Sequence, residues 1–400
     1  MKTIALVCPA TVGHHRTYLR FFTRALLDLD CAVVAFTPEA ADFTQWAASL
    51  HSAEFNRLRT CELHYSRAFR VPGPLSILFD KLAWVRFTGR LIQASGVRPD
   101  LVFHTWLDNC LTPGLTAGLT DLVFPFKWSG LYFHPWYLRQ NSRYAQIRVG
   151  PLANHAALQS RHCPGVAVLD EGIADKLEAH LEHKPVIVFP DLADDSPPDL
   201  DFAPAIQIRA QAAGRRIVGL LGVLSKRKGV LTLIEMAQQA AREPWYFVFA
   251  GEFDQASFLP QELRALSEFI QSNPPNCFFH LQHIPDEPQF NALVNACDVV
   301  FAVYKNFKSS SNLLSKAALF HKPVLASDAY CMGERVHQYS LGLTVDENSV
   351  PQCLNALRQI SAQLDETGGF ASARFQEYTR RHSREQLQAS FEAILSAAHL

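Results

Sequence analysis

The stretch Asp298–Asp328, DVVFAVYKNFKSSSNLLSKAALFHKPVLASD, decides the fold of this chain. It opens with five apolar residues, Val299–Val303, whose length and β-branched content are typical of a buried strand. After a polar loop, the sequence predicts a helix that starts near Leu313 and stops before Pro323. A second apolar run, Pro323–Ala326, closes the unit. The order strand, loop, helix, strand predicts one βαβ crossover.

The loop of this crossover has the composition of an anion site. Ser311 or Asn312 is placed to cap the helix, and Lys316 lies one turn after Asn312 on the same face. Lys308 precedes the serines. The amides of a first helical turn, with the helix dipole, suit an anion such as a diphosphate. The alternative is that serines and lysines cap and solvate an ordinary helix.

Composition limits the classes of protein that this chain can belong to. Its 400 residues fit two domains, and 48% hydrophobic with 19% charged residues describes a globular chain. A net charge of −1 argues against nucleic acid as a partner. Nine scattered cysteines without a Cys-x-x-Cys pair indicate reduced thiols and a cytoplasmic protein. We expect neither a signal peptide nor a membrane-spanning segment.

The first half begins like a Rossmann domain. A strand at Thr3–Cys8, a loop with Gly13 and His14, a helix at Tyr18–Leu27 and a strand at Ala32–Phe36 give this order. The loop lacks a full Gly-x-Gly-x-x-Gly pattern, so dinucleotide binding is not supported.

The segment Arg57–Arg98 interleaves basic and apolar residues. It suits a helix at a membrane surface that meets anionic lipid or a lipid-linked acceptor. We favour the alternative, a core helix whose basic residues face water.

Two histidines fall at the predicted carboxyl ends of strands, where ligands bind in open α/β sheets. His104 ends the strand Asp100–His104, and His134 ends the strand within Lys127–Pro135. A single histidine is more often structural, and we prefer His134 as the functional one.

The acidic, proline-containing segment Asp191–Pro204 predicts a domain linker. Strands and helices alternate again after it, which predicts a second doubly wound domain. We therefore expect domains at 1–195 and 205–380, with a C-terminal helix over 381–400 that could cross back to the first domain.

A second basic loop, GVLSKRKG at Gly222–Gly229, joins a predicted strand to a predicted helix. Its spacing is not that of a Walker loop. If this loop and Ser309–Asn312 face one crevice, Lys228 and Lys316 would converge on a diphosphate. The pair His280 and His283 lacks further metal ligands nearby, and we expect no metal site.

These features resemble the GT-B nucleotide-sugar glycosyltransferases, especially glycosyltransferase family 4. The residues that carry the resemblance are Leu221-Gly222, Lys228-Gly229, Phe249-Ala250-Gly251, Ala296–Val300 and Lys322-Pro323-Val324.

The resemblance implies two Rossmann-like domains across a cleft and transfer of a sugar from a nucleoside diphosphate sugar. The acceptor would be a glycolipid, a polysaccharide or a small molecule, transfer would retain the anomeric configuration, and neither cofactor nor metal would take part. Lys228 and Lys316 would hold the diphosphate, and His134 would lie near the reacting sugar. The other residues implied in donor binding are Gly222, Gly251, His283, Ile284, Ser309, Ser310, Ser311, Asn312 and Leu313. Gly13, His14 and His104 would lie on the acceptor side.

Three positions depart from the family pattern. Val223 replaces an arginine, and Lys308 with Lys316 replaces a pair of glutamates of which the second accepts hydrogen bonds from the ribose hydroxyls. Lysine only donates, so it cannot do this. Lys316 could grip phosphate in compensation, the donor could be unusual, or catalysis could be lost. The alternatives to a transferase are a binding or partner protein without turnover and, further off, a sugar-nucleotide 2-epimerase.

Overall fold

The computed structural model describes residues 1–11, 14–66, 75–139, 150–182 and 184–400. The chain forms two compact units. The first comprises Met1–Pro190 with Ser383–Leu400, and the second comprises Asp191–His382. The segment Asp191–Pro204, expected as a linker, therefore belongs to the second unit and runs into the helix α8 (Ala203–Ala212).

The first unit is built on a seven-stranded parallel sheet of order β3-β2-β1-β4-β5-β6-β7. The strands are β1 (Thr3–Val7), β2 (Ala32–Thr37), β3 (Leu58–Glu62), β4 (Leu101–His104), β5 (Trp128–Tyr132), β6 (Val166–Val168) and β7 (Val186–Val188). The strand order reverses between β1 and β4. Loops at the carboxyl ends of these two strands therefore flank a topological switch point, which is the usual ligand position in such sheets.

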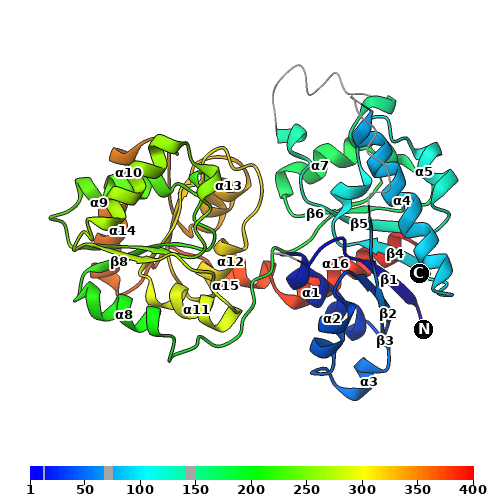
Figure 1. Ribbon diagram of the computed structural model, residues 1–400, viewed down its shortest axis with the longest axis horizontal. Helices are drawn as coiled ribbons and strands as arrows, with labels where there is room; N and C mark the ends of the chain where they lie inside the picture. Colours follow the sequence, from blue (N-terminus) through cyan, green and yellow to red (C-terminus); the bar gives the residue numbers. More distant parts are fainter. Residues whose placement is uncertain (12–13, 67–74, 140–149, 183) are drawn as a thin grey trace. The chain divides into compact units, whose positions relative to one another are not determined.

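Helices lie on both faces of this sheet (Figure 1). They are α1 (His14–Asp28), α2 (Ala40–Ala47), α3 (Ser52–Phe55), α4 (Ser76–Ala94), α5 (Ala117–Val123), α7 (Glu171–His180) and α16 (Arg384–Ala397), with 3-10 turns η1 (Leu107–Cys110), η2 (Trp136–Arg139), η3 (Gly150–Leu152) and η4 (Ala156–Gln159). Helix α4 buries Trp84, Val85, Thr88, Gly89 and Ile92, as the core-helix interpretation of this basic segment predicts. Arg67 and Arg70 of the same segment lie outside the described residues.

The C-terminal helix α16 belongs to the first unit because aromatic side chains join it to the sheet. The ring of Phe391 lies 5.3 Å from that of Phe22 and 5.0 Å from those of Phe103 and Phe189, between centroids. Burial of several aromatic rings is a large hydrophobic contribution.

The second unit contains a six-stranded parallel sheet of order β10-β9-β8-β11-β12-β13. The strands are β8 (Arg216–Leu221), β9 (Trp245–Ala250), β10 (Cys277–His280), β11 (Val299–Ala302), β12 (Val324–Ser327) and β13 (Gly342–Val345). The helices are α8, α9 (Val230–Gln239), α10 (Pro260–Gln271), α11 (Glu287–Ala296), α12 (Asn312–Leu319), α13 (Tyr330–Tyr339), α14 (Val350–Thr367) and α15 (Phe375–Arg381), with 3-10 turns η5 (Lys226–Lys228) and η6 (Gln255–Ser257).

The predicted βαβ crossover is confirmed as β11, α12 and β12, with Val300 paired in register with Val324. Helices α9 and α14 pack together on one face of the sheet, and α8 and α11 pack together on the other (Figure 1). The strand order reverses between β8 and β11, so the loops after these two strands flank the switch point of this unit.

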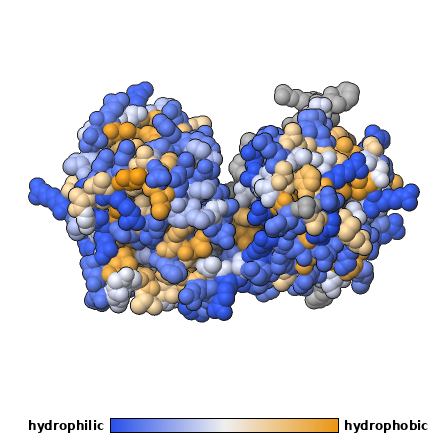
Figure 2. All heavy atoms as spheres, turned by 90° about the horizontal axis from the view of Figure 1, so that it is seen from below, coloured by the Kyte–Doolittle hydropathy of each residue, from blue (hydrophilic) through white to orange (hydrophobic). Residues whose placement is uncertain are grey.

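Hydrophilic side chains cover most of the face of each unit drawn in Figure 2, and apolar side chains appear there in small patches. In the described part of the chain, no helix combines the length and the apolar character needed to cross a bilayer.

Candidate functional site

Two glycines make a floor without side chains at the strand ends of the second unit. Gly222 follows β8, and Gly251 follows β9. Gly251 has φ 140°, and a Cβ there would lie 1.9 Å from the carbonyl oxygen of Gly222. Only glycine fits so close an approach of two backbones. Gly251 is therefore required by the close packing of these two loops, and the role of Gly222 and Gly251 in donor binding stays a prediction.

Lys228 reaches this floor from the basic loop. Its Nζ would lie 3.0 Å from a Cβ on Gly222, and it lies 3.4 Å from the carbonyl oxygen of Leu221. Burial, and then repulsion from Arg227, lower the pKa of Lys228 to about 8. Within the described residues, no carboxylate pairs with this ammonium group. A shielded cation without a counter-ion is suited to bind an anion.

The neighbouring Lys226 is held differently. Its Nζ lies 2.6 Å from a carboxylate oxygen of Glu262 on α10. Lys226 is therefore neutralised by an acid on α10, whereas Lys228 of the same 3-10 turn lies beside Gly222.

The sequence predicted that Lys316 binds phosphate, but its ammonium group is already paired within the second unit. Its side chain is only 4% exposed, and its Nζ lies 2.6 Å from Oε2 of Glu287 and 2.7 Å from Oδ1 of Asn291. The ammonium group also lies 5.1 Å from the ring centroid of Phe290. All three partners are on α11. A buried lysine needs such compensation, and here Glu287 supplies it.

The serine loop starts α12 as predicted, and the structure resolves its cap. Ser311 is the N-cap residue, its hydroxyl accepts a 3.4 Å bond from the amide of Leu313, and Asn312 is the first helical residue. Of its neighbours, Ser309 is half-buried, and the Ser310 hydroxyl is hydrogen-bonded to the Asp191 carboxylate. The Ser310 hydroxyl thus has a structural role, and the backbone amides stay as the proposed anion contacts.

His283 and Ile284 form the turn after β10. The His283 side chain is 74% exposed, with Nδ1 3.7 Å from a carboxylate oxygen of Glu252. Ile284 is half-buried against the core of the unit. Glu252 directly follows Gly251, so this turn is next to the glycine floor, and its role in donor binding stays a prediction.

In the first unit, His134 lies two residues beyond β5, and Asp108 holds it. Oδ1 of Asp108 lies 3.0 Å from Nδ1 of His134 and also accepts its backbone N–H at 3.0 Å. Oδ2 accepts the amide of Phe133 at 3.0 Å. With Nδ1–H donated to Asp108, the neutral ring leaves Nε2 as a hydrogen-bond acceptor. This arrangement can bind a hydroxyl group or take its proton.

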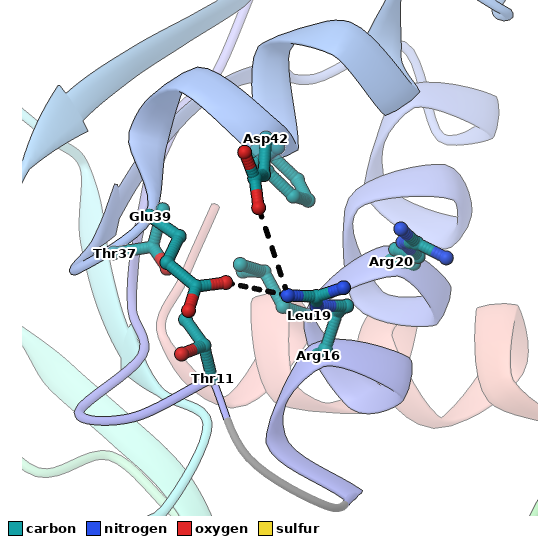
Figure 3. A pocket seen from close by; sticks show the side chains of 8 residues that line it. Thr11, Arg16, Leu19, Arg20, Thr37, Glu39 and Asp42 are labelled. Atoms are coloured by element: carbon teal, nitrogen blue, oxygen red, sulfur yellow. Dashed lines mark hydrogen bonds and ion pairs between the residues drawn. The ribbon is translucent and has the colours of Figure 1, made fainter. Parts of the chain in front are cut away.

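A small hollow lies where β1 and β2 end (Figure 3). Arg16 of α1 lies between two acids there, with Nη2 2.5 Å from Glu39 and 3.8 Å from Asp42. Hydrogen bonds from Thr11 and then from Arg16 lower the pKa of Glu39. The hollow can offer both donors and acceptors to a polar ligand.

The three residues expected on the acceptor side have different outcomes. Gly13 lies outside the described residues. His14 begins α1, and the position of its side chain is outside the described part of the molecule. His104 does end β4, but it is 3% exposed and lies among Cys110, Phe124 and Trp128. The side chain of His104 is therefore part of the core of the first unit and is not accessible to a ligand.

Comparisons with known proteins bear on both units. Residues 215–363 match the family model described as glycosyl transferases group 1. The matched residues lie within the second unit. No curated protein sequence matches the chain.

Solved glycosyltransferase structures are similar along the whole chain. Anabaena HepE in complex with UDP-glucose has a TM-score of 0.67 and 16% identity, covering 99% of this chain and 100% of its own. Sucrose-phosphate synthase from Thermosynechococcus elongatus has a TM-score of 0.61 and 18% identity, covering 98% and 96%. WaaG, a glycosyltransferase involved in lipopolysaccharide biosynthesis, has a TM-score of 0.59 and 14% identity, covering 99% of each chain. These likenesses confirm the predicted GT-B fold.

Sequence reasoning missed two acids of this GT-B chain that hold predicted site residues. Glu287 binds Lys316, and Asp108 binds His134. Each acid is distant in sequence from its partner. A signal for Glu287 existed, because a lysine inside the apolar face of α12 requires a carboxylate. Asp108 had no such signal, since a strand-to-helix turn commonly contains aspartate.

Proposed function

We propose that this chain is a glycosyltransferase that moves a sugar from a nucleoside diphosphate sugar to an acceptor hydroxyl. The observation that carries the proposal is the ammonium group of Lys228, which is shielded beside Gly222 and has no acidic partner in the described chain. A diphosphate is an anion that compensates such a charge. The match of residues 215–363 to glycosyl transferases group 1 supports the same conclusion.

In this proposal the bond between the sugar C1 and the diphosphate oxygen breaks, and negative charge develops on the leaving nucleoside diphosphate. Lys228 and the amides at the start of α12 would stabilise that charge. His134, oriented by Asp108, would position the sugar or the acceptor hydroxyl. Lys316 no longer belongs to the set that contacts phosphate, because Glu287 and Asn291 occupy it.

The finer expectations from the sequence and from the family resemblance stay proposals. They are retention of the anomeric configuration, activity without metal or cofactor, a cytoplasmic location, and an acceptor that is a glycolipid, a polysaccharide or a small molecule. HepE is described in complex with UDP-glucose, so uridine diphosphate sugars are the first donors to try. NMR of the product would give its anomeric configuration, and assays with and without EDTA would give the metal requirement.

Binding of UDP, GDP and ADP, measured by calorimetry without metal, tests the proposal. Lys228→Met should weaken binding of the preferred diphosphate about tenfold to a hundredfold. Lys226→Met removes the same charge from the same turn, and we expect it to bind normally because Lys226 pairs with Glu262. Absence of binding by all three diphosphates would overturn the proposal, as would equal losses in the two variants.

A binding protein without turnover is the second candidate. Burial of Lys316 at a position where the family has a glutamate favours it. Tight binding of a nucleoside diphosphate sugar, with neither transfer nor hydrolysis of the donor over hours, would establish this second function.

Contact with a membrane surface is a separate proposal for the first unit. Leu75, Ile77 and Phe79 at the start of α4 are 56%, 59% and 46% exposed, which supports it. Co-sedimentation with vesicles that contain anionic lipid, compared with the variant Ile77→Ser/Phe79→Ser, measures this contact. Equal binding by both proteins would exclude these residues from it.

A further inference from the structure

We propose that Glu287 accepts hydrogen bonds from the ribose hydroxyls of the donor, so that the site selects ribonucleotides over 2′-deoxyribonucleotides. The inference rests on the proposed function, since it assigns a residue of the same donor site.

An ion pair with Lys316 fixes the position of the Glu287 carboxylate. The ammonium group is buried, and it binds one oxygen of Glu287 and the side-chain oxygen of Asn291. Asn291 in turn donates to the carbonyl oxygens of Asp194 at 3.2 Å and Ser196 at 2.8 Å, which fixes the orientation of its amide. Glu287 and Asn291 lie on the first two turns of α11, and Lys316 reaches them from α12. Lys316 therefore holds Glu287 in place before any ligand arrives.

The same carboxylate has capacity left for a ligand. The Glu287 side chain is 36% exposed, whereas that of Lys316 is 4% exposed. In the described part of the chain, Lys316 binds Oε2, and no second group binds Oε1. An ionised carboxylate accepts at both oxygens and donates at neither. Glu287 thus presents acceptors to solvent at this edge of the sheet.

The ring of Phe290 connects Glu287 to the glycine floor. Phe290 follows Glu287 by three residues, on the same face of α11, and its ring lies 3.7 Å from where a Cβ on Gly222 would be. Lys228 approaches that same Cβ position to 3.0 Å. Two elements therefore border Gly222. One is the side chain of Lys228, which can only donate hydrogen bonds, and the other is α11, which carries the carboxylate of Glu287, which can only accept them.

These two groups suit different parts of one ligand. A diphosphate offers only acceptor oxygens, so it is attracted by Lys228 and repelled by Glu287. Hydroxyl groups on adjacent carbons can both donate to one carboxylate. A ribonucleoside diphosphate has both features, and a 2′-deoxyribonucleoside diphosphate lacks one of the two hydroxyls. A second anion at Lys316 is disfavoured because Glu287 and Asn291 already compensate its charge.

The experiment compares the dissociation constants of UDP, GDP and ADP with those of their 2′-deoxy forms, and of TDP, on the unmodified protein. We expect the preferred ribonucleotide to bind about ten to a hundred times tighter than its deoxy form, as for loss of a hydrogen bond to a charged group. This comparison needs no mutation, so it does not depend on whether a variant folds.

Two variants then assign the effect. Glu287→Gln should reduce the discrimination to within about threefold, because the hydroxyl acceptor is weakened, while inorganic diphosphate should bind at least as tightly as before, because a repelling negative charge is removed. Glu268→Gln, an exposed site on α10, should leave the discrimination unchanged.

The outcomes separate this inference from the proposed function. Equal binding of ribonucleotide and deoxyribonucleotide, tightest binding of TDP, or full discrimination in a folded Glu287→Gln protein would overturn the role of Glu287 and leave the transferase proposal standing. If no nucleoside diphosphate binds, both fall.

Discussion

The backbone N–H of Asp191 donates a 2.9 Å hydrogen bond to Nδ1 of His382. These are the first and last residues of the second unit. The Asp191 carboxylate also binds the Ser310 hydroxyl, and Arg335, 2% exposed, lies 3.9 Å from it. One buried hydrogen-bonded cluster therefore joins both ends of this unit to the serine loop, where we expect the diphosphate.

Asp191→Ala should destabilise this cluster. The change removes the carboxylate that faces the buried guanidinium of Arg335, so we expect a loss of about 2–4 kcal/mol in the free energy of unfolding of the second unit. Hydrogen–deuterium exchange should accelerate over residues 305–316. Asp195→Ala, at an exposed site nearby, is the control. Unchanged exchange in that segment would show that Asp191 does not support the loop.

Binding of a nucleoside diphosphate should depend on pH through Lys228. Its pKa is lowered to about 8 in the free protein, and only the protonated form attracts a diphosphate. A bound anion raises that pKa. Affinity should therefore fall as the pH rises from 7 through 8. In Lys228→Met the affinity should be weak and flat between pH 7 and pH 9.5, and a fall of equal size in this variant would contradict the assignment. Calorimetry across that range measures both.

The sequence predicted much of the second unit because its strands are continuous apolar runs. Buried strands of a parallel sheet have this pattern, and it predicts strands at Arg216–Leu221, Trp245–Ala250 and Cys277–His280, which are the boundaries of β8, β9 and β10. Helix α13 and strand β13 were missed. Gly342 at the start of β13 has no side chain, and of the remaining strand residues Leu343 and Thr344 are half-buried and only Val345 is buried, so the apolar signal is short.

The candidate site was predictable where it depends on the local chain, and not where it depends on distant partners. Local spacing predicted that a serine caps α12 and that Lys228 lies at a strand end. Local spacing also predicted that the ammonium group of Lys316 is unpaired and can bind phosphate, which is wrong. Its partner Glu287 lies 29 residues earlier in the chain, so local spacing does not reveal the ion pair. His104 was misplaced for a related reason, since the end of a strand can still lie beneath the loops that follow it.

Asp108→Asn should impair transfer without weakening donor binding. An amide cannot hold the Nδ1–H of His134 as a carboxylate does, and one of its atoms would face a backbone N–H with a donor. We expect kcat to fall about tenfold to a hundredfold while the dissociation constant of the nucleoside diphosphate changes less than about twofold. Asp175→Asn, exposed on α7, is the control. A kcat equal to that of the control would exclude an orienting role for Asp108.

Acid should destabilise the first unit through buried histidines. Burial lowers the pKa of His104 to about 4, and burial with repulsion from His180 lowers that of His155 to about 4. Because the unfolded chain binds these protons near pH 6.5, it holds more of them than the folded unit between pH 6.5 and 4, and stability falls as the pH falls through that window. His104 alone should cost about 2 kcal/mol between pH 7.5 and pH 5. Urea unfolding followed by tryptophan fluorescence reports on this unit, since every tryptophan except Trp245 belongs to it. In His104→Gln the loss between the two pH values should shrink to the part that His155 contributes, and an unchanged loss would show that His104 is protonated in the folded unit.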